Sequence, residues 1–146
     1  DIVIFGKKAQ VCGILVTEEF SGIFDTKIKM LDTTWDADLV DMVRSTYIMD
    51  VIKKDDLMEK ISLYSNKFIR KLNRLKSIQN VRGLGSLIAF DFQYGEDRDI
   101  FYMELYNKGM LCNPTGKKSI RLRPHLTATK EDFDKAYKLI GDVLNG

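Results

Sequence analysis

Two adjacent lysines stand between apolar stretches near the start of the chain, in DIVIFGKKAQVCGILV. Burial disfavours the charged form of an amine, so a buried lysine loses its charge or gains a partner. At least one of Lys7 and Lys8 therefore lies at the surface or does chemistry. The chemistry open to a lysine amine without its charge is that of a nucleophile and a base.

A second pair of cations lies in SIRLRP, towards the end of the chain. Arg121 and Arg123 alternate with Leu122, which predicts that both arginine side chains lie on one face of a strand. Two guanidinium groups on a sheet face either hold a carboxylate in a bidentate manner or are solvated at an edge. The spacing alone favours neither of these roles.

For the other candidate residues, a structural role is favoured over a catalytic or binding role. The glycines of RGLGS lie before a strand rather than between a strand and a helix, which favours a tight turn over a phosphate cradle. His125 follows Pro124 and is expected in a loop rather than as a ligand or base. Cys12 and Cys112 lack the spacing of a metal site or a disulfide framework, so we predict two buried thiols and no metal site.

Composition limits the class of protein. Of the 146 residues 45% are hydrophobic, which is enough for one ordinary domain. Lys and Arg number 23 against 21 Asp and Glu, a net charge of +2 that is too balanced to indicate a nucleic-acid or membrane-surface partner. No stretch approaches the roughly 18 apolar residues of a membrane span, and none is typical of a signal peptide. We expect a cytoplasmic globular protein.

The elements that must position these groups follow from the periodicity. Residues 1–16 predict two short strands around a turn, and residues 17–38 a polar connector. Apolar residues at three- and four-residue steps then predict two helices, each with one apolar face that must cover something. Their apolar positions are Leu39, Val40, Val43, Tyr47, Ile48 and Val51 in the first, and Leu57, Ile61, Tyr64, Phe68, Leu72 and Leu75 in the second.

The last third of the chain alternates strands and helices. VRGLGSLIAFDFQ predicts a glycine turn and one strand, DRDIFYMELYNKG a helix ended by Gly109, MLCNP a short strand, and KKSIRLRP a strand stopped by Pro124. Thr129 and Asp132 form a capping-box pattern before a final helix. The order β, α, β, β, α predicts a small α+β layer, in which helices pack on one side of a sheet.

Four segments, taken together, resemble the class III (ω-amino acid) aminotransferases, enzymes of fold type I that depend on pyridoxal 5′-phosphate. They are DIVIFGKKAQVCG, TTWDADLVDMVRS, VRGLGSLIAF and KSIRLRPHLT, and they occur in the family's order over essentially the whole chain. The resemblance implies an α/β and α+β fold, with residues 1–38 as the end of the large cofactor-binding domain. Residues 39–146 would then be the interdomain helix and the small C-terminal α+β domain.

The resemblance assigns the two lysines different roles. Lys7 is implied to form the internal aldimine (Schiff base) with pyridoxal phosphate and then, as a free base, to move the proton between the substrate carbon and the cofactor. The apolar stretches on either side of Lys7 are expected to desolvate its amine and so keep it neutral. Lys8 is expected to do no chemistry.

Two further residues match functional positions of the family. Thr34 is implied to donate its hydroxyl and backbone N–H to the cofactor phosphate of the neighbouring subunit, across the interface of a homodimer; the alternative is that Thr33 or Thr34 caps the following helix. Arg121 is implied to pair with an active-site glutamate and to be released to hold a substrate or 2-oxoglutarate carboxylate, whereas Arg123 is expected to be structural. The chain departs from the family in WDAD, which adds two carboxylates beside the phosphate position.

The activity that the resemblance implies is transfer of a terminal amino group to 2-oxoglutarate. FGKKAQVCG and TTW…LVDMVR are most similar to members that act on L-lysine, which yields 2-aminoadipate 6-semialdehyde and L-glutamate; 4-aminobutyrate or another ω-amino acid is the alternative substrate. An alternative of another class is a non-catalytic domain whose lysine pair and arginines bind anions. Since the chain begins at Asp1 and enters a strand at once, we expect a piece of a longer protein that does not transaminate alone.

Overall fold

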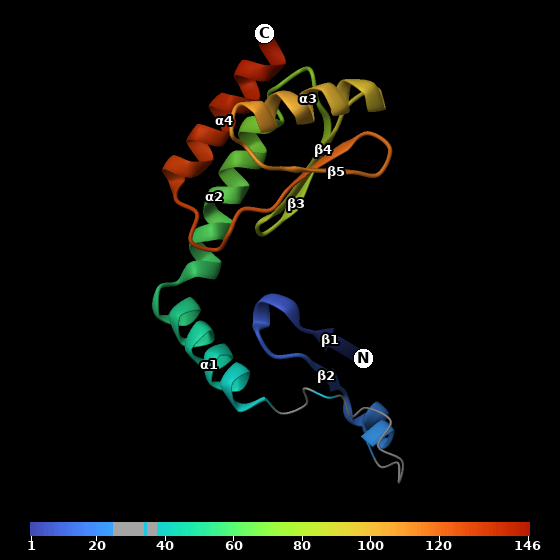
Figure 1. Cartoon of the computed structure of the whole chain (residues 1–146), viewed down its shortest axis with the longest axis vertical. Coiled ribbons are helices and arrows are strands. Elements are labelled where there is room, and N and C mark those ends of the chain that lie inside the picture. The colour runs from blue at the N-terminus through green and yellow to red at the C-terminus, as the bar shows by residue number, and fades with distance from the viewer. Residues whose placement is uncertain (25–33, 35–37) are drawn as a thin grey trace. The chain divides into compact units, whose positions relative to one another are not determined.

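The computed structural model describes residues 1–24, 34 and 38–146 (Figure 1). These residues form two compact units, Asp1–Asp55 and Asp56–Gly146. The domain boundary predicted after residue 38 stays a prediction. Thr33 and the segment 35–37, which carry part of the threonine–tryptophan motif, lie outside the described residues.

The first unit begins with an antiparallel hairpin of β1 (Ile2–Phe5) and β2 (Gly13–Val16), as the sequence predicts. The turn between the strands contains the short 3-10 helix η1 (Lys7–Ala9). Phe5 lies opposite Gly13, where a Cβ atom would come within 2.5 Å of the Phe5 ring. At the last residue pair before the turn, the ring of Phe5 therefore packs over Gly13, next to the turn that contains the lysine pair.

The connector of the first unit contains η2 (Glu18–Phe24) and leads to helix α1 (Leu39–Lys54). The Asp38 carboxylate caps α1 by accepting hydrogen bonds from the backbone N–H groups of Val40 and Asp41, at 2.9 and 3.1 Å. An N-cap must directly precede the first helical residue for its side chain to reach these donors. The interpretation of Thr34 as the cap is therefore wrong, because Asp38 has that role.

Helix α1 forms at the predicted residues, but its apolar residues are not gathered on one face and no residue of α1 is buried. The exposed members of the predicted stripe are Leu39, Val40, Val43, Tyr47 and Val51. Ile48 is half-buried. The expectation that an apolar face of α1 covers another part of the protein is thus not met among the described residues.

The second unit is a four-stranded antiparallel sheet with three helices, in the spatial strand order β3-β4-β6-β5. Its elements are α2 (Leu57–Leu72), β3 (Gln79–Leu84), β4 (Leu87–Asp91), α3 (Gly95–Asn107), β5 (Asn113–Thr115), β6 (Ser119–Leu122) and α4 (Lys130–Asn145). As predicted, α4 begins at a complete capping box between Thr129 and Asp132, and α3 is followed by Gly109 with a φ of 83°.

One hydrophobic core holds the second unit together. Alternate residues of β4 and β6 are buried, and they meet the apolar faces of all three helices in a single cluster (Figure 1). Its fully or nearly fully buried members include Ile61, Phe68, Leu72, Ile88, Phe90, Phe101, Leu105, Ile120, Leu122, Phe133 and Ile140. The helices therefore cover one face of the sheet and leave the other face open, which confirms the predicted α+β layer.

The strand count differs from the prediction, because VRGLGSLIAFDFQ forms a hairpin of β3 and β4 rather than a turn and one strand. Gly85, with a φ of 54°, makes the turn. Gly83 lies inside β3, where a Cβ atom would come within 2.7 Å of the Leu87 carbonyl oxygen. The favoured interpretation of the glycines, a turn with a close backbone approach, is confirmed. The strand expected in MLCNP begins only at Asn113.

Two further expectations are tested by burial. Cys12 is exposed and Cys112 is only half-buried, so the prediction of two buried thiols is wrong. Cys12 lies in the turn between β1 and β2, which the described residues of the first unit leave uncovered. His125 is an exposed loop residue, as expected. Among the described residues, no helix is long and apolar enough to cross a membrane.

Candidate functional site

The lysine pair occupies a tightly closed turn. The Gln10 N–H donates to the Lys7 carbonyl oxygen at 2.9 Å, and the Ala9 N–H donates to the Gly6 carbonyl oxygen at 3.3 Å. Lys7 and Gln10 both have positive φ angles, of 57° and 66°. A Cβ atom on Gly6 would lie 2.8 Å from Cys12 Sγ, so the close packing of the turn explains the small residue before the lysines.

The side chains of Lys7 and Lys8 are both exposed. Neither ammonium group has a hydrogen bond or ion pair with any part of the chain that the structure describes. The expected desolvation of Lys7 by its apolar flanks is not provided by the described residues, because Ile2, Val3 and Ile4 of β1 are themselves exposed. The degree of burial therefore does not distinguish Lys7 from Lys8. The turn leaves the Lys7 amine available to a ligand.

Helix α1 is tied to the lysine turn by a polar contact within the first unit. Arg44 Nη1 donates to Asp41 Oδ1 at 2.6 Å and to Gln10 Oε1 at 3.3 Å. Gln10 closes the turn that starts at Lys7, so this contact connects the turn to α1. Because the side chains of Arg44 and Asp41 are both about half exposed, solvent screens the ion pair and it contributes little stability.

Thr34 is described as an exposed turn residue. Its neighbours Thr33 and Trp35 lie outside the described residues, as does Asp36, the first of the two carboxylates that WDAD adds to the family pattern. The second, Asp38, is engaged as the N-cap of α1. Capping thus provides a structural role for one of the two residues that depart from the family.

Arg121 lies in the middle of β6, on the open face of the sheet. It is exposed between the buried residues Ile120 and Leu122, as the predicted alternation requires. Arg123 is also exposed, but it lies one residue beyond the end of β6, so the prediction that both arginines share a strand face is confirmed for Arg121 alone. Arg121 is paired across the sheet with Ala89 of β4 and Asn113 of β5. Its guanidinium group makes no hydrogen bond or ion pair within the described ranges, and it is therefore a free cation there.

A polar network missed by the sequence analysis lies beside Arg121. The carboxylate of Asp91 accepts hydrogen bonds from Ser119 Oγ at 2.6 Å, Asn80 Nδ2 at 2.8 Å and Arg82 Nη1 at 2.9 Å. Burial raises the pKa of Asp91, but these hydrogen bonds and the charge of Arg82 outweigh it and lower the pKa from 3.8 to about 2. A signal was present, since Asp91 is an acid inside the apolar run LIAFDF.

The three residues assigned by resemblance belong to different units: Lys7 and Thr34 to the first, and Arg121 to the second. Their chemistry fits pyridoxal phosphate and a carboxylate substrate, since an unpaired amine suits an aldehyde, a hydroxyl suits a phosphate, and an unpaired guanidinium suits a carboxylate. The described residues contain no group of three His, Cys, Asp or Glu side chains that could hold a metal ion.

The chain belongs to the class III aminotransferases, because the model of that family matches residues 1–144. Its fold is that of the fold type I enzymes that use pyridoxal phosphate, which confirms the expected fold class. L-lysine-epsilon aminotransferase of Mycobacterium bovis is 31% identical over 153 residues, covering 99% of this chain. The enzyme of the same name from Amycolatopsis lactamdurans is 31% identical over 155 residues, also covering 99% of this chain.

The chain spans about a third of the length of these relatives, 34% in both cases. Among solved structures, a lysine aminotransferase from M. tuberculosis superposes with a TM-score of 0.90 at 30% identity, covering 99% of this chain and 35% of that one. A transaminase from a marine Virgibacillus has a TM-score of 0.89 at only 17% identity, with 99% of this chain and 39% of that chain covered. The two chains therefore share the fold although few of their residues are identical.

Proposed function

We propose that the protein containing this chain transfers the terminal amino group of L-lysine to 2-oxoglutarate, yielding 2-aminoadipate 6-semialdehyde and L-glutamate. The observation that carries the proposal is a Lys7 amine that is exposed, and unpaired among the described residues, in a closed turn within a segment that matches class III aminotransferases. The similarity to L-lysine-epsilon aminotransferases over 99% of the chain supports lysine as the amino donor.

Lys7 has the central role in this proposal. Pyridoxal phosphate, when bound, supplies an aldehyde that condenses with amines and a ring that accepts electrons from the carbon that loses its proton. The Lys7 amine would hold the cofactor through its aldehyde, and Lys7 Nζ, when free, would take and return the proton. Lys8, next to it in the same turn, does no chemistry in this proposal.

Thr34 and Arg121 bind the two anionic groups. We propose that the Thr34 hydroxyl and N–H donate to the cofactor phosphate in the partner subunit of a homodimer, with the site at the interface. Arg121 binds a carboxylate of 2-oxoglutarate or of the amino donor, because its guanidinium fork matches a carboxylate in bidentate geometry. Its lack of a partner among the described residues supports this role.

Reduction with borohydride followed by peptide mass mapping tests the assignment of Lys7. In the full-length protein saturated with pyridoxal phosphate, we expect a stable cofactor adduct on Lys7 and none on Lys8. Lys7→Ala should abolish the visible absorbance of the bound cofactor, whereas the matched variant Lys8→Ala should retain it. An adduct confined to Lys8 would contradict the assignment. Failure to bind the cofactor at all would instead favour the anion-binding domain.

The second candidate substrate is 4-aminobutyrate. A probable mitochondrial 4-aminobutyrate aminotransferase of Caenorhabditis elegans is 29% identical over 154 residues and matches 100% of the chain. The ratio of kcat/KM for L-lysine to that for 4-aminobutyrate, with 2-oxoglutarate as acceptor, decides between the two. A ratio below one would replace lysine by 4-aminobutyrate and leave the reaction class unchanged.

We also propose a cytoplasmic location. The two cysteines are free thiols, which is typical of a reducing compartment. Cell fractionation followed by detection of the full-length protein tests this, and recovery in an organelle or membrane fraction would contradict it.

A further inference from the structure

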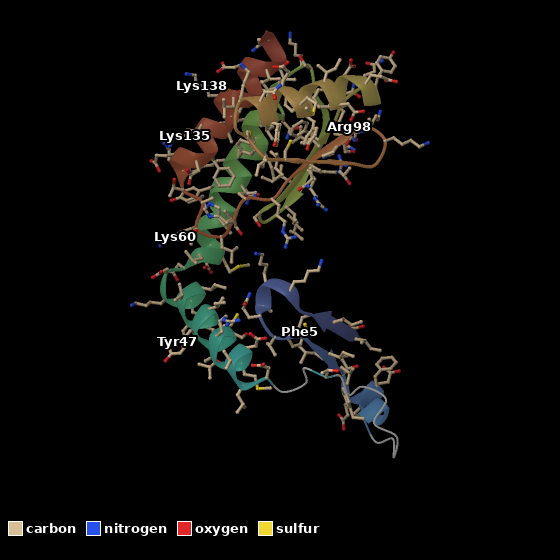
Figure 2. All side chains as sticks on the ribbon, in the orientation of Figure 1. Phe5, Tyr47, Lys60, Arg98, Lys135 and Lys138 are labelled. Carbon is tan, nitrogen blue, oxygen red and sulfur yellow. The ribbon has the colours of Figure 1, made fainter. Side chains whose placement is uncertain are left out.

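Arg98 of α3 is bound to the loop that joins β5 to β6 (Figure 2). Its side chain is only 11% exposed. Nη1 donates to the carbonyl oxygens of Thr115 and Ser119 at 3.4 and 3.3 Å, and Nη2 donates to that of Lys117 at 3.4 Å. One guanidinium group therefore binds the carbonyl oxygens of the last residue of β5, of a residue in the loop and of the first residue of β6.

The segment before Arg98 holds the same loop by two further contacts. The Phe92 N–H donates to the Lys118 carbonyl oxygen at 2.9 Å. Gly95, the first residue of α3, lies so close to the loop that a Cβ atom there would be 2.8 Å from the Lys117 carbonyl oxygen. The loop is thus hydrogen-bonded at Lys118 by the residue that follows β4, and the backbone at the start of α3 lies close to it at Lys117.

Ser119, the first residue of β6, is held from two sides. Its carbonyl oxygen accepts from Arg98, and its hydroxyl donates to Asp91 at 2.6 Å. Arg121 follows two residues later on the same strand, about 7 Å along it. The backbone position of Arg121 is therefore set by a strand whose first residue is fixed through both its main chain and its side chain.

This support matters because the hairpin is short. β5 has 3 residues and pairs only with β6. β6 has 4 residues and also pairs with β4, but its ladder begins at Ser119, so the contacts of Ser119 fix the end of the strand where the loop enters. Lysine could not replace Arg98 fully, since its single ammonium group lacks the planar fork that reaches several acceptors at once. A site that must grip a carboxylate in a bidentate manner loses affinity when its arginine is displaced by a fraction of an ångström.

We propose that Arg98 is a positioning residue for Arg121, and that it thereby sets the affinity of the enzyme for the carboxylate that Arg121 binds; the inference rests on the function proposed for Arg121. Arg98 touches neither substrate nor cofactor in this scheme. Its loss should weaken binding of 2-oxoglutarate rather than slow the reaction at saturation, because the groups that move the proton belong to the lysine turn.

Steady-state kinetics of the full-length holoenzyme, with the amino donor saturating and 2-oxoglutarate varied, test the inference. For Arg98→Met we expect the KM for 2-oxoglutarate to rise about ten-fold, the equivalent of roughly 1.4 kcal/mol, with kcat within about two-fold of the wild type. Arg98→Lys keeps the charge and should give a smaller rise. The matched control Arg70→Met removes an exposed arginine of α2 and should leave the KM unchanged.

Arg121→Met and the double variant complete the design. Arg121→Met should itself raise the KM, and adding Arg98→Met to it should cause no further rise, because the guanidinium to be positioned is gone. If Arg121→Met leaves the KM unchanged, the role proposed for Arg121 is wrong. If Arg121→Met raises the KM but neither Arg98 variant does, or if the two effects multiply, the inference about Arg98 alone is overturned.

The role of Arg98 can be tested even if the Arg98→Met variant does not fold. Should Arg98→Met not fold, Arg98→Lys and Gly95→Ala, which disturbs the same loop from the start of α3, should still raise the KM for 2-oxoglutarate, by less than ten-fold, with kcat within about two-fold of the wild type. A variant that only lowers the unfolding temperature, with KM and kcat unchanged, assigns Arg98 a purely structural role and contradicts the inference.

Discussion

Replacing Asp91 by asparagine tests the buried network on the open face of the sheet. The change keeps the size of the side chain but removes a charge that accepts hydrogen bonds from Ser119, Asn80 and Arg82. Lowering a pKa from 3.8 to about 2 corresponds to roughly 2 kcal/mol, at about 1.4 kcal/mol for each tenfold change in proton affinity. The side chain is 13% exposed, so solvent screening reduces this value little.

The stability that Asp91→Asn removes should decrease as the pH falls. The folded-state pKa lies below the unfolded one, so the ionised carboxylate contributes its full stability above about pH 4. The contribution is lost as the pH falls through the folded-state pKa of about 2. We therefore expect Asp91→Asn to lower the free energy of unfolding by about 2 kcal/mol at pH 7, and the difference from the wild type to shrink as the pH falls from about 4 to 2.

Urea unfolding of the 146-residue chain measures this difference. Circular dichroism follows the transition, and amide hydrogen exchange in β4 and β6 assigns it to the second unit. The matched control is Asp142→Asn, an exposed carboxylate on α4, which should change the stability by less than about 0.5 kcal/mol. A penalty for Asp91→Asn that is equally large at pH 7 and near pH 2, or that matches the control at pH 7, would refute the reasoning.

Three further predictions concern packing, capping and thiol reactivity. Gly83→Ala places a Cβ atom 2.7 Å from the Leu87 carbonyl oxygen and should destabilise the second unit by about 1–3 kcal/mol in urea unfolding, whereas Gly141→Ala, with open space around it, should not destabilise α4. Thr129→Ala removes the capping box and should lower the thermal stability by about 1 kcal/mol; an equal loss in Thr129→Ser would argue against the cap. Burial raises the pKa of Cys112 to about 11, so only about one thiol in a thousand is ionised at pH 8. Iodoacetamide should therefore modify the exposed Cys12 first, and equal rates by peptide mapping would contradict this.

Local periodicity predicted the elements whose faces are covered within the chain. The apolar steps of α2 and α4 match their buried residues, and the capping box of α4 lies where Thr129 and Asp132 indicate. In α1 the same kind of pattern predicted the helix but not the exposure of its apolar residues. Strand β3 was missed because most of its side chains are exposed and its glycines were attributed to the turn alone.

The candidate site was predictable only where residue type suffices. The spacing correctly predicted that Arg121 is exposed on a strand face, although the strand ends at Leu122, one residue before Arg123. The N-cap of α1 was not predicted, because several polar residues precede the helix. Only the structure shows that the Asp38 carboxylate reaches the N–H groups of the first turn. The contacts of Arg98 lie between residues 17 to 21 positions apart, and such long-range pairing leaves no periodic trace in a sequence.

The positive φ of Lys7 has a consequence for the stability of the hairpin. A left-handed backbone conformation costs a residue with a Cβ atom roughly 1–2 kcal/mol, a cost that glycine avoids. Lys7→Gly should therefore slow amide hydrogen exchange in β1 and β2 of the 146-residue chain, whereas Lys8→Gly, at a position of negative φ, should not. Glycine is the residue that folding alone favours at position 7, and the role proposed for the Lys7 amine would account for a lysine there.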